Sequence, residues 1–275
     1  MPDTLFLELA ALGLCTGFFA GLLGVGGGMM LVPFMTYFLG TRGVEPGLAV
    51  KMAIATSMAT IVFTSISSVR AHHQRGGVRW GIVRTLAPGI ATGALLTSLG
   101  IFALLKGRYL ALFFAVFVGF SAIQMFRSQG AATGNKPLPG PGGLFGAGTG
   151  IGLISGLLGA GGGFISVPFM TRHGVPLHQA VGTSAALGFP IAVFNVCGYL
   201  FSGAAVAGRP EYSWGYLWLP ALASVACCSV LTAPLGARVA HKLPVKQLKR
   251  IFAALLMCLA LYMLYKGLVP TPAAA

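Results

Sequence analysis

Acidic residues are almost absent from this chain of 275 residues. Only four are present, and charged residues make up 8% of the sequence, whereas an average soluble domain has about 25%. Hydrophobic residues make up 56%, so the chain does not have the composition of a soluble domain. Its formal net charge of +14 would suggest a nucleic-acid partner in a soluble protein. In a membrane protein, lysine and arginine gather in cytoplasmic loops, and we therefore expect no nucleic acid.

Motifs for metal binding, catalysis and ATP hydrolysis are also missing. The five cysteines lack Cys-x-x-Cys spacing, and we expect them to be small buried hydrophobic residues. The chain has no His-Glu-x-x-His or Gly-x-Ser-x-Gly motif, and no Gly-Lys-Ser/Thr follows its glycine runs. We expect a protein that is not an enzyme, with no catalytic residue, metal or cofactor and no direct use of ATP. The N-terminus lacks a basic region, so a cleaved signal peptide is not expected.

Apolar runs of a length that crosses a bilayer recur along the whole chain. About 20 residues are needed for one crossing, and the long runs lie near residues 5–23, 47–69, 81–103, 109–126, 176–201, 214–235 and 249–268. Shorter apolar pieces lie at 29–39, 144–158 and 164–170. The sequence therefore predicts an all-α protein that passes through a lipid bilayer several times.

The chain contains an internal duplication. Residues 13–36 and 148–171 agree at 14 of 24 positions at a constant offset of 135, and both contain Leu-Leu-Gly-x-Gly-Gly-Gly and Val-Pro-Phe-Met-Thr. Repeated hydrophobic segments that are interrupted by glycine are typical of secondary transporters whose site lies between two repeats. We expect a first transmembrane repeat over residues 1–130, a linker over 131–143 and a second repeat over 144–275.

The distribution of basic residues predicts that the two repeats have opposite orientations. The densest basic loop of the first half is 70–84, whereas that of the second half, 236–250, comes one element later. An even number of crossings must separate two cytoplasmic loops, so residues 144–170 should enter and return on one side as a hairpin, and residues 5–36 should do the same. Three crossing helices follow each hairpin. Both termini are then periplasmic, with six basic residues on that side: Arg42, Lys51, Lys106, Arg108, Arg209 and Lys266.

The glycine runs are the main candidates for a substrate site. A glycine inside a helix costs about 1 kcal/mol relative to alanine, so each run is interpreted as a break between two short helices. Backbone N–H groups at the start of the following helix could bind an anion. The candidate residues are Gly26, Gly27, Gly28, Gly161, Gly162 and Gly163. Packing is the alternative role for glycines, and we favour it for those at spacings of four: Gly13, Gly17, Gly21, Gly148, Gly152 and Gly156.

Polar side chains in the following helices are further candidates. Hydroxyl pairs recur at Thr56–Ser57 and Thr183–Ser184; they could line the cavity or bond only their own backbone carbonyls. Asn195 is added because a buried amide in a membrane needs partners. Lys51 lies near a membrane interface. For its ammonium group we favour extension to water over attraction of the substrate. His72 and His73 are expected to be solvated loop residues. Since no carboxylate lies in mid-membrane, an anion is the expected cargo.

Several of these segments resemble the TauE/SafE family of sulfite exporters and sulfonate permeases, also called the toluene sulfonate uptake permease family. They are the doubled glycine motif with Val-Pro-Phe, residues 53–57 and 61–68, the loop 70–80, Gly182-Thr183-Ser184 and residues 243–252. The similarity spans nearly the whole chain. It implies a multi-pass carrier of the bacterial inner membrane for sulfur-containing anions such as sulfite, sulfoacetate or another organosulfonate.

The leading hypothesis is a secondary transporter that works by alternating access and binds such an anion between the two hairpins. Protons are a candidate coupling ion, although no residue that binds them is identified. The alternatives are an anion channel, a transporter for another small organic anion, an intramembrane enzyme and a membrane scaffold. The particular anion, the direction of transport and the formation of a homo-oligomer stay open.

Overall fold

The computed structural model describes residues 3–23, 27–127, 136–240 and 245–268. Helices dominate these residues, and seven of them are long and apolar enough to cross a membrane. The prediction of an all-α polytopic membrane protein is confirmed.

The first half is a helical hairpin followed by three long helical segments. Its elements are α1 (Asp3–Leu23), α2 (Gly28–Gly40), α3 (Pro46–His73), α4 (Trp80–Leu95) with the π-helical turn η1 (Leu96–Ile101) and α5 (Phe102–Leu104), and α6 (Gly107–Arg127). The start of α3 is fixed by its sequence. The Glu45 carboxylate accepts hydrogen bonds from the N–H groups of Gly47 and Leu48 at 2.9 and 2.7 Å, and Pro46 is the first helical residue.

The second half repeats this order. Its elements are α7 (Pro141–Leu158), α8 (Gly163–Arg172), α9 (Leu177–Ser202), α10 (Leu219–Ala240) and α11 (Val245–Leu268), with a short antiparallel pair of strands, β1 (Ser213–Trp214) and β2 (Leu217–Trp218), before α10. The predicted apolar runs lie mainly in helices, but the run predicted over 214–235 begins in the strand pair, and its helix α10 starts only at Leu219. Of the predicted linker, residues 131–135 lie outside the described part of the chain.

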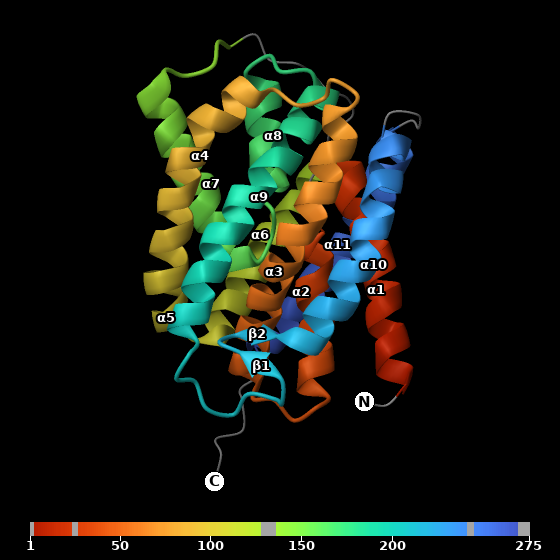
Figure 1. The fold of residues 1–275 in the computed structure, drawn as a ribbon, viewed down its shortest axis with the longest axis vertical. Coiled ribbons are helices and arrows are strands. Elements are labelled where there is room, and N and C mark those ends of the chain that lie inside the picture. Colours follow the sequence, from red (N-terminus) through yellow and green to blue (C-terminus); the bar gives the residue numbers. More distant parts are fainter. Residues whose placement is uncertain (1–2, 24–26, 128–135, 241–244, 269–275) are drawn as a thin grey trace.

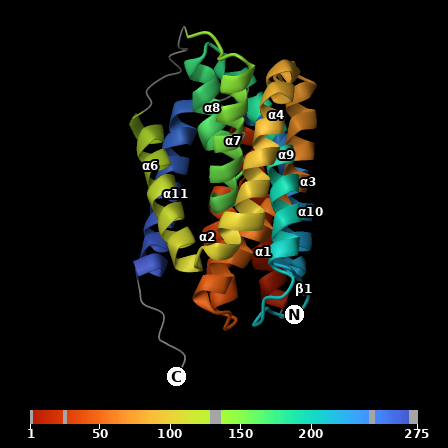
Figure 2. The ribbon, with the colours of Figure 1, turned by 90° about the vertical axis from the view of Figure 1, so that its left-hand side faces the viewer.

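The two hairpins open toward opposite ends of the bundle (Figures 1 and 2). In Figure 1, α1 begins at the lower end and α2 returns to it, whereas α7 begins at the upper end and α8 returns there. The turn after α3 lies at the upper end, and α11 ends at the lower end. The hairpins thus approach each other from the two ends of the bundle.

The packing partners of the two halves correspond. The first hairpin helix, α1, packs along α10, and its counterpart α7 packs along α4, while α3 packs on α9 and α6 on α11. Glycine makes the first two contacts close: a Cβ added to Gly21 would collide with Ala233 O, and one added to Gly152 with Ile90 O. The prediction that the regularly spaced glycines serve packing is confirmed for these positions.

The cysteines differ from the expectation of burial. Cys15, Cys197, Cys227 and Cys258 are exposed, and Cys228 is partly buried. The four exposed cysteines lie in long apolar helices, whereas Cys228 lies against Gly13 of α1. The physical reason is that a thiol is acceptable to lipid as well as to a protein interior, so an apolar run does not tell which of the two a cysteine faces.

Candidate functional site

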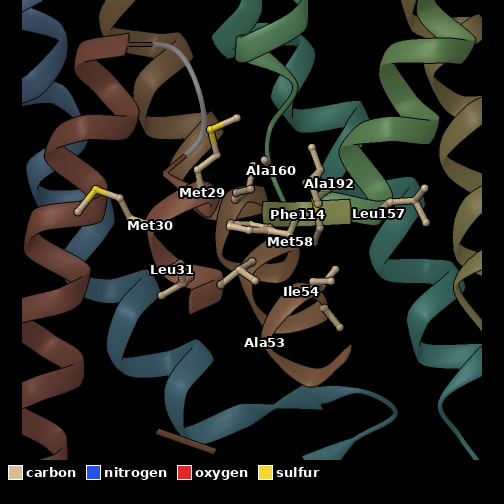
Figure 3. Close-up of a cluster of buried hydrophobic side chains, with 14 of the residues drawn as sticks. Met29, Met30, Leu31, Ala53, Ile54, Met58, Phe114, Leu157, Ala160 and Ala192 are labelled. Carbon is tan, nitrogen blue, oxygen red and sulfur yellow. The ribbon is translucent and has the colours of Figure 1, made fainter. Parts of the chain in front are cut away.

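The two glycine breaks meet inside the bundle. A Cβ added to Gly28, at the start of α2, would collide with the carbonyl oxygen of Gly159 at the end of α7 and lie 3.0 Å from Cα of Ala160. The Ser57 hydroxyl of α3 donates a hydrogen bond of 2.8 Å to the same Gly159 oxygen. Figure 3 shows the turn with Ala160 close to Met29 and Met58. The contact joins backbone to backbone, which only glycine permits.

The second helix of each hairpin starts from a glycine in the left-handed conformation. Gly27 precedes α2 with φ 70°, and Gly162 precedes α8 with φ 76°. In α8 the first hydrogen bonds run from the N–H groups of Ile165 and Ser166 to Gly162 O. The N–H groups of Gly163 and Phe164 therefore precede the helical ladder, as the first donors of a helix do. Gly26 lies outside the described residues.

The two predicted threonines hold the starts of other helices. Thr56 Oγ1 accepts a hydrogen bond of 3.0 Å from the N–H of Trp218, directly before α10. Thr183 Oγ1 accepts one of 2.9 Å from the N–H of Arg79, directly before α4. Because α10 and α4 occupy corresponding places in the two halves, the two bonds are counterparts. Neither of these hydrogen bonds is made to the threonine's own helix. The alternative in which the hydroxyls bond only carbonyls of their own backbone therefore does not describe these two residues.

Ser184 and Gly161 line a small cavity inside the bundle. The cavity is about 10 Å³ and is lined also by Thr64, Ser65 and Ser68 of α3, while Ser166 donates a 2.8 Å hydrogen bond to the Ser184 hydroxyl. Within the described residues the buried hydroxyl of Ser68 has no hydrogen-bond partner. This volume is at the lower limit for one water molecule. We call this group half-site A.

A second polar group lies on the opposite side of the break, around Asn195. Its Nδ2 donates to Ile191 O at 2.8 Å, but its Oδ1 and the hydroxyl of Ser155 are buried without a partner among the described residues. A Cβ added to Gly162 would lie 3.0 Å from Ser155 Oγ, and one added to Gly156 would collide with Asn195 Oδ1. We call Ser155, Asn195 and Ser57 half-site B.

Several residues at or near the two half-sites have counterparts in the other half of the chain. Thr56 and Thr183 differ by 127 in number, and the same offset connects Ser68 with Asn195. The sequence reasoning did not select Ser68 or Ser155. Continuing the comparison of the two halves from Thr56–Ser57 to the end of each helix would have placed Ser68 opposite Asn195. No sequence signal distinguishes Ser155, whose counterpart at the offset of 135 is Ala20.

His72 also has a counterpart in the other half of the chain, and its predicted location in a solvated loop is wrong. It lies in α3 with 1% of its surface exposed, and its Nε2 is 3.0 Å from Gly21 O. Its counterpart at the offset of 127 is Tyr199, whose hydroxyl donates a 2.5 Å hydrogen bond to Gly156 O. Gly21 and Gly156 are themselves counterparts. Helix α3 continues beyond the apolar run to His73. Because His72 is still part of this helix, its side chain faces α1.

This arrangement of long apolar helices around two crossed, glycine-broken hairpins defines a polytopic membrane transporter. The chain belongs to the TauE/SafE family: it matches the family described as Sulfite exporter TauE/SafE over residues 9–263. It is 37% identical to a "Probable membrane transporter protein" of Haemophilus influenzae, over 96% of this chain and 99% of that protein. A protein of Methanocaldococcus jannaschii with the same description is 26% identical over 94% and 97% of the two chains. No solved structure matches this chain.

Proposed function

We propose that the protein is a secondary transporter for sulfur-containing anions such as sulfite, sulfoacetate or related organosulfonates. The anion binds where the two hairpins cross, between half-sites A and B. The proposed membrane is the bacterial inner membrane, with both termini in the periplasm. The name of the family supports the substrate class, and relatives named as membrane transporters fit a role without catalysis.

The observation that carries the proposal is the set of unpartnered polar atoms around the crossing. Ser68 Oγ, Ser155 Oγ and Asn195 Oδ1 are buried without hydrogen-bond partners in the described structure. A buried polar group without a partner costs about 1–3 kcal/mol, so these three atoms, on helices α3, α7 and α9, suggest contacts to a ligand. The two hydroxyls can donate to an anion, as can the N–H groups at the start of α8. Asn195 Oδ1 is an acceptor and suits a water or an acidic O–H that accompanies the anion.

The proposed mechanism is alternating access between inverted repeats. The hairpins that open to opposite ends, and the matching pairs α1–α10 and α7–α4, support two repeats related by a twofold axis in the membrane plane. The cavity of half-site A, at about 10 Å³, is too small for sulfite, so the hairpins must separate to admit it. We propose that one hairpin and its partner helix move against the central helices α3 and α9.

An apolar cluster favours this mechanism over the alternative, an anion channel. Figure 3 shows Leu31 of α2, Ile54 of α3 and Phe114 of α6 beside the crossing, and Ile54 and Phe114 are fully buried. A channel needs a continuous polar path, which this cluster interrupts. A carrier can keep such a barrier on one side while the other side opens.

Uptake into proteoliposomes tests the proposal. The purified protein should accumulate sulfite or sulfoacetate, with uptake that saturates and is accelerated by unlabelled substrate on the opposite side of the membrane. An imposed pH gradient should increase uptake if protons supply the energy. Taurine and thiosulfate serve as comparison substrates. Flux that rises linearly with concentration and shows no acceleration by substrate on the opposite side would support the channel.

A further inference from the structure

A large cavity with basic walls lies at the lower end of the bundle, away from the hairpin crossing. Its volume is about 820 Å³, and it lies among the end of α2, the starts of α3 and α6, the end of α11 and the segment between β1 and β2. We call it the basic cavity. The side chains that matter for its chemistry are Lys51, Lys106, Arg108, Lys266, Tyr216 and Tyr265.

Positive charge is concentrated in this cavity. Of the 18 basic residues of the chain, four line it, and all four belong to the six that the charge distribution leaves outside the cytoplasm. Glu45 is the acidic residue in the lining, and both its carboxylate oxygens are engaged by the N–H groups that start α3. Basic residues are disfavoured in the loops on the outer side of a membrane. The membrane topology of the chain therefore does not account for four cations around one cavity on that side.

Two of the four cations, Lys51 and Arg108, donate hydrogen bonds to backbone carbonyls. Lys51 Nζ donates a 3.0 Å hydrogen bond to Ala103 O and lies 5.7 and 5.6 Å from the ring centres of Phe102 and Tyr216. Arg108 Nε donates to Gly267 O at 2.8 Å, which leaves the terminal nitrogens of its guanidinium for other partners. Burial raises the pKa of the Tyr216 phenol, so this side chain stays a neutral hydrogen-bond donor at the edge of the cavity.

The cavity leads toward the crossing but ends before it. Val50 of α3 and Ala111 of α6 line its floor. One helical turn further along the same helices lie Ile54 and Phe114, which are both fully buried. An anion in the basic cavity is therefore separated from the crossing by the apolar cluster of Figure 3.

We propose that the basic cavity is a separate binding site for organic anions that carry a sulfonate or carboxylate group, occupied before the anion reaches the hairpin crossing. Its volume falls in the range of about 300–1,000 Å³ that is typical of sites for small organic molecules and is much larger than sulfite needs. Cations bind the acidic groups, and the tyrosines contact the carbon skeleton. The choice of sulfonates as the first ligand rests on the proposed function.

The test is binding of sulfoacetate to the full-length protein in nanodiscs of zwitterionic phosphatidylcholine, measured by isothermal titration calorimetry. Lys51→Gln and Arg108→Gln should each weaken binding about tenfold, the lower limit for losing one hydrogen bond to a charged group. Glutamine can still donate to Ala103 O or Gly267 O, so the helix ends keep their partner. The matched control is Lys136→Gln, an exposed cation before α7, which should bind as the wild type does.

Two further arms separate this proposal from the transport function. Ser121→Ala changes a hydroxyl that bonds Phe117 O of its own helix, outside both sites, and should leave binding and transport unchanged. Wild-type binding by both cavity variants, together with normal transport, would overturn the cavity and leave the transporter standing. Binding that the cavity variants weaken, in a protein that transports no sulfur anion, would support the cavity and overturn the proposed function.

The same acidic chemistry could come from a lipid headgroup, and a final arm distinguishes the two sources. Titrations are repeated in nanodiscs with phosphatidylglycerol. Competition by the lipid, with clear binding in phosphatidylcholine alone, supports a site for a soluble anion. If sulfoacetate fails to bind in phosphatidylcholine, while Lys51→Gln and Arg108→Gln reduce the enrichment of phosphatidylglycerol, the site belongs to lipid and the proposal is overturned.

Discussion

The two halves of the molecule share their scaffold and differ in the polar residues at their centre. Thr56 and Thr183 make corresponding hydrogen bonds to the starts of α10 and α4. In the same way, His72 and Tyr199 contact the carbonyls of Gly21 and Gly156. These pairs preserve the position of an interaction although one half has histidine where the other has tyrosine. Contacts that hold helices together are therefore kept in both halves.

The half-sites around the crossing are not equal. Half-site B has the Asn195 amide and the Ser155 hydroxyl, whereas the corresponding positions of half-site A hold Ser68 and Ala20. The lower end of the bundle also holds the basic cavity. We infer that the duplication supplies the moving frame and that later differences between the halves supply substrate recognition and direction. The predictions below test this division, in order of decreasing effect on folding stability.

Replacing Gly27 or Gly162 by leucine should have the largest effect. Both have positive φ, and a side chain in such a conformation costs about 1–3 kcal/mol. An added Cβ would also lie 2.7 Å from Thr16 O at Gly27, and 2.5 Å from Ile191 Cδ1 at Gly162. Transport in proteoliposomes should be abolished while membrane insertion, followed by fractionation, persists.

The matched control for these variants is Gly76→Leu. Gly76 also has positive φ, but nothing lies within 4 Å of its added Cβ and it is in a turn at the upper end. It should keep most of the transport activity. Wild-type transport by both Gly27→Leu and Gly162→Leu would contradict a role for the breaks.

Thr56→Val and Thr183→Val should lower the free energy of unfolding by different amounts, because the two corresponding hydrogen bonds differ in burial. Thr56→Val leaves the buried N–H of Trp218, 2% exposed, without its acceptor, and should lower the free energy of unfolding by about 1–3 kcal/mol. Arg79 is exposed, so its N–H can bond water and Thr183→Val should cost less. Unfolding in denaturant, with the exposed Thr92→Val as control, measures both. An equal loss for the two variants would contradict the argument from burial.

Tyr199→Phe should have a smaller effect. Hydrogen bonds between side chains and helices in membranes contribute about 0.6 kcal/mol on average, and this change removes only the hydroxyl that donates to Gly156 O. Tyr212→Phe, at an exposed position before β1, is the control and should be neutral. A loss of several kcal/mol would mean that the hydroxyl has a role beyond this contact.

The all-α, multi-pass fold could be predicted from the sequence because it depends on long apolar runs, and the two hairpins because they depend on repeated residues. The sequence was less informative about individual side chains. Thr56 and Thr183 could be recognised as a pair, but their acceptor role depends on helices α10 and α4, which are distant in sequence. Ser155, His72 and the basic cavity could not be found because a residue's facing direction in an apolar helix depends on neighbours that composition does not reveal.

Ser68→Ala and Ser155→Ala should leave stability nearly unchanged, although both positions are buried. Each hydroxyl lacks a partner within the described structure, so its removal breaks no internal hydrogen bond and spares the cost of keeping a buried polar group unpaired. In transport, the expected effect is large: an anion that loses one donor should bind about tenfold more weakly. The control is Ser121→Ala in α6, whose hydroxyl bonds Phe117 O of its own helix.

The comparison of half-sites predicts a greater loss of apparent affinity for Ser155→Ala than for Ser68→Ala, because half-site B also holds the Asn195 amide and can bind more of the anion's solvation shell. Equal affinities for both variants and the wild type, measured as initial uptake rates over a range of sulfite concentrations, would remove both hydroxyls from the site and leave the crossed hairpins as a packing device.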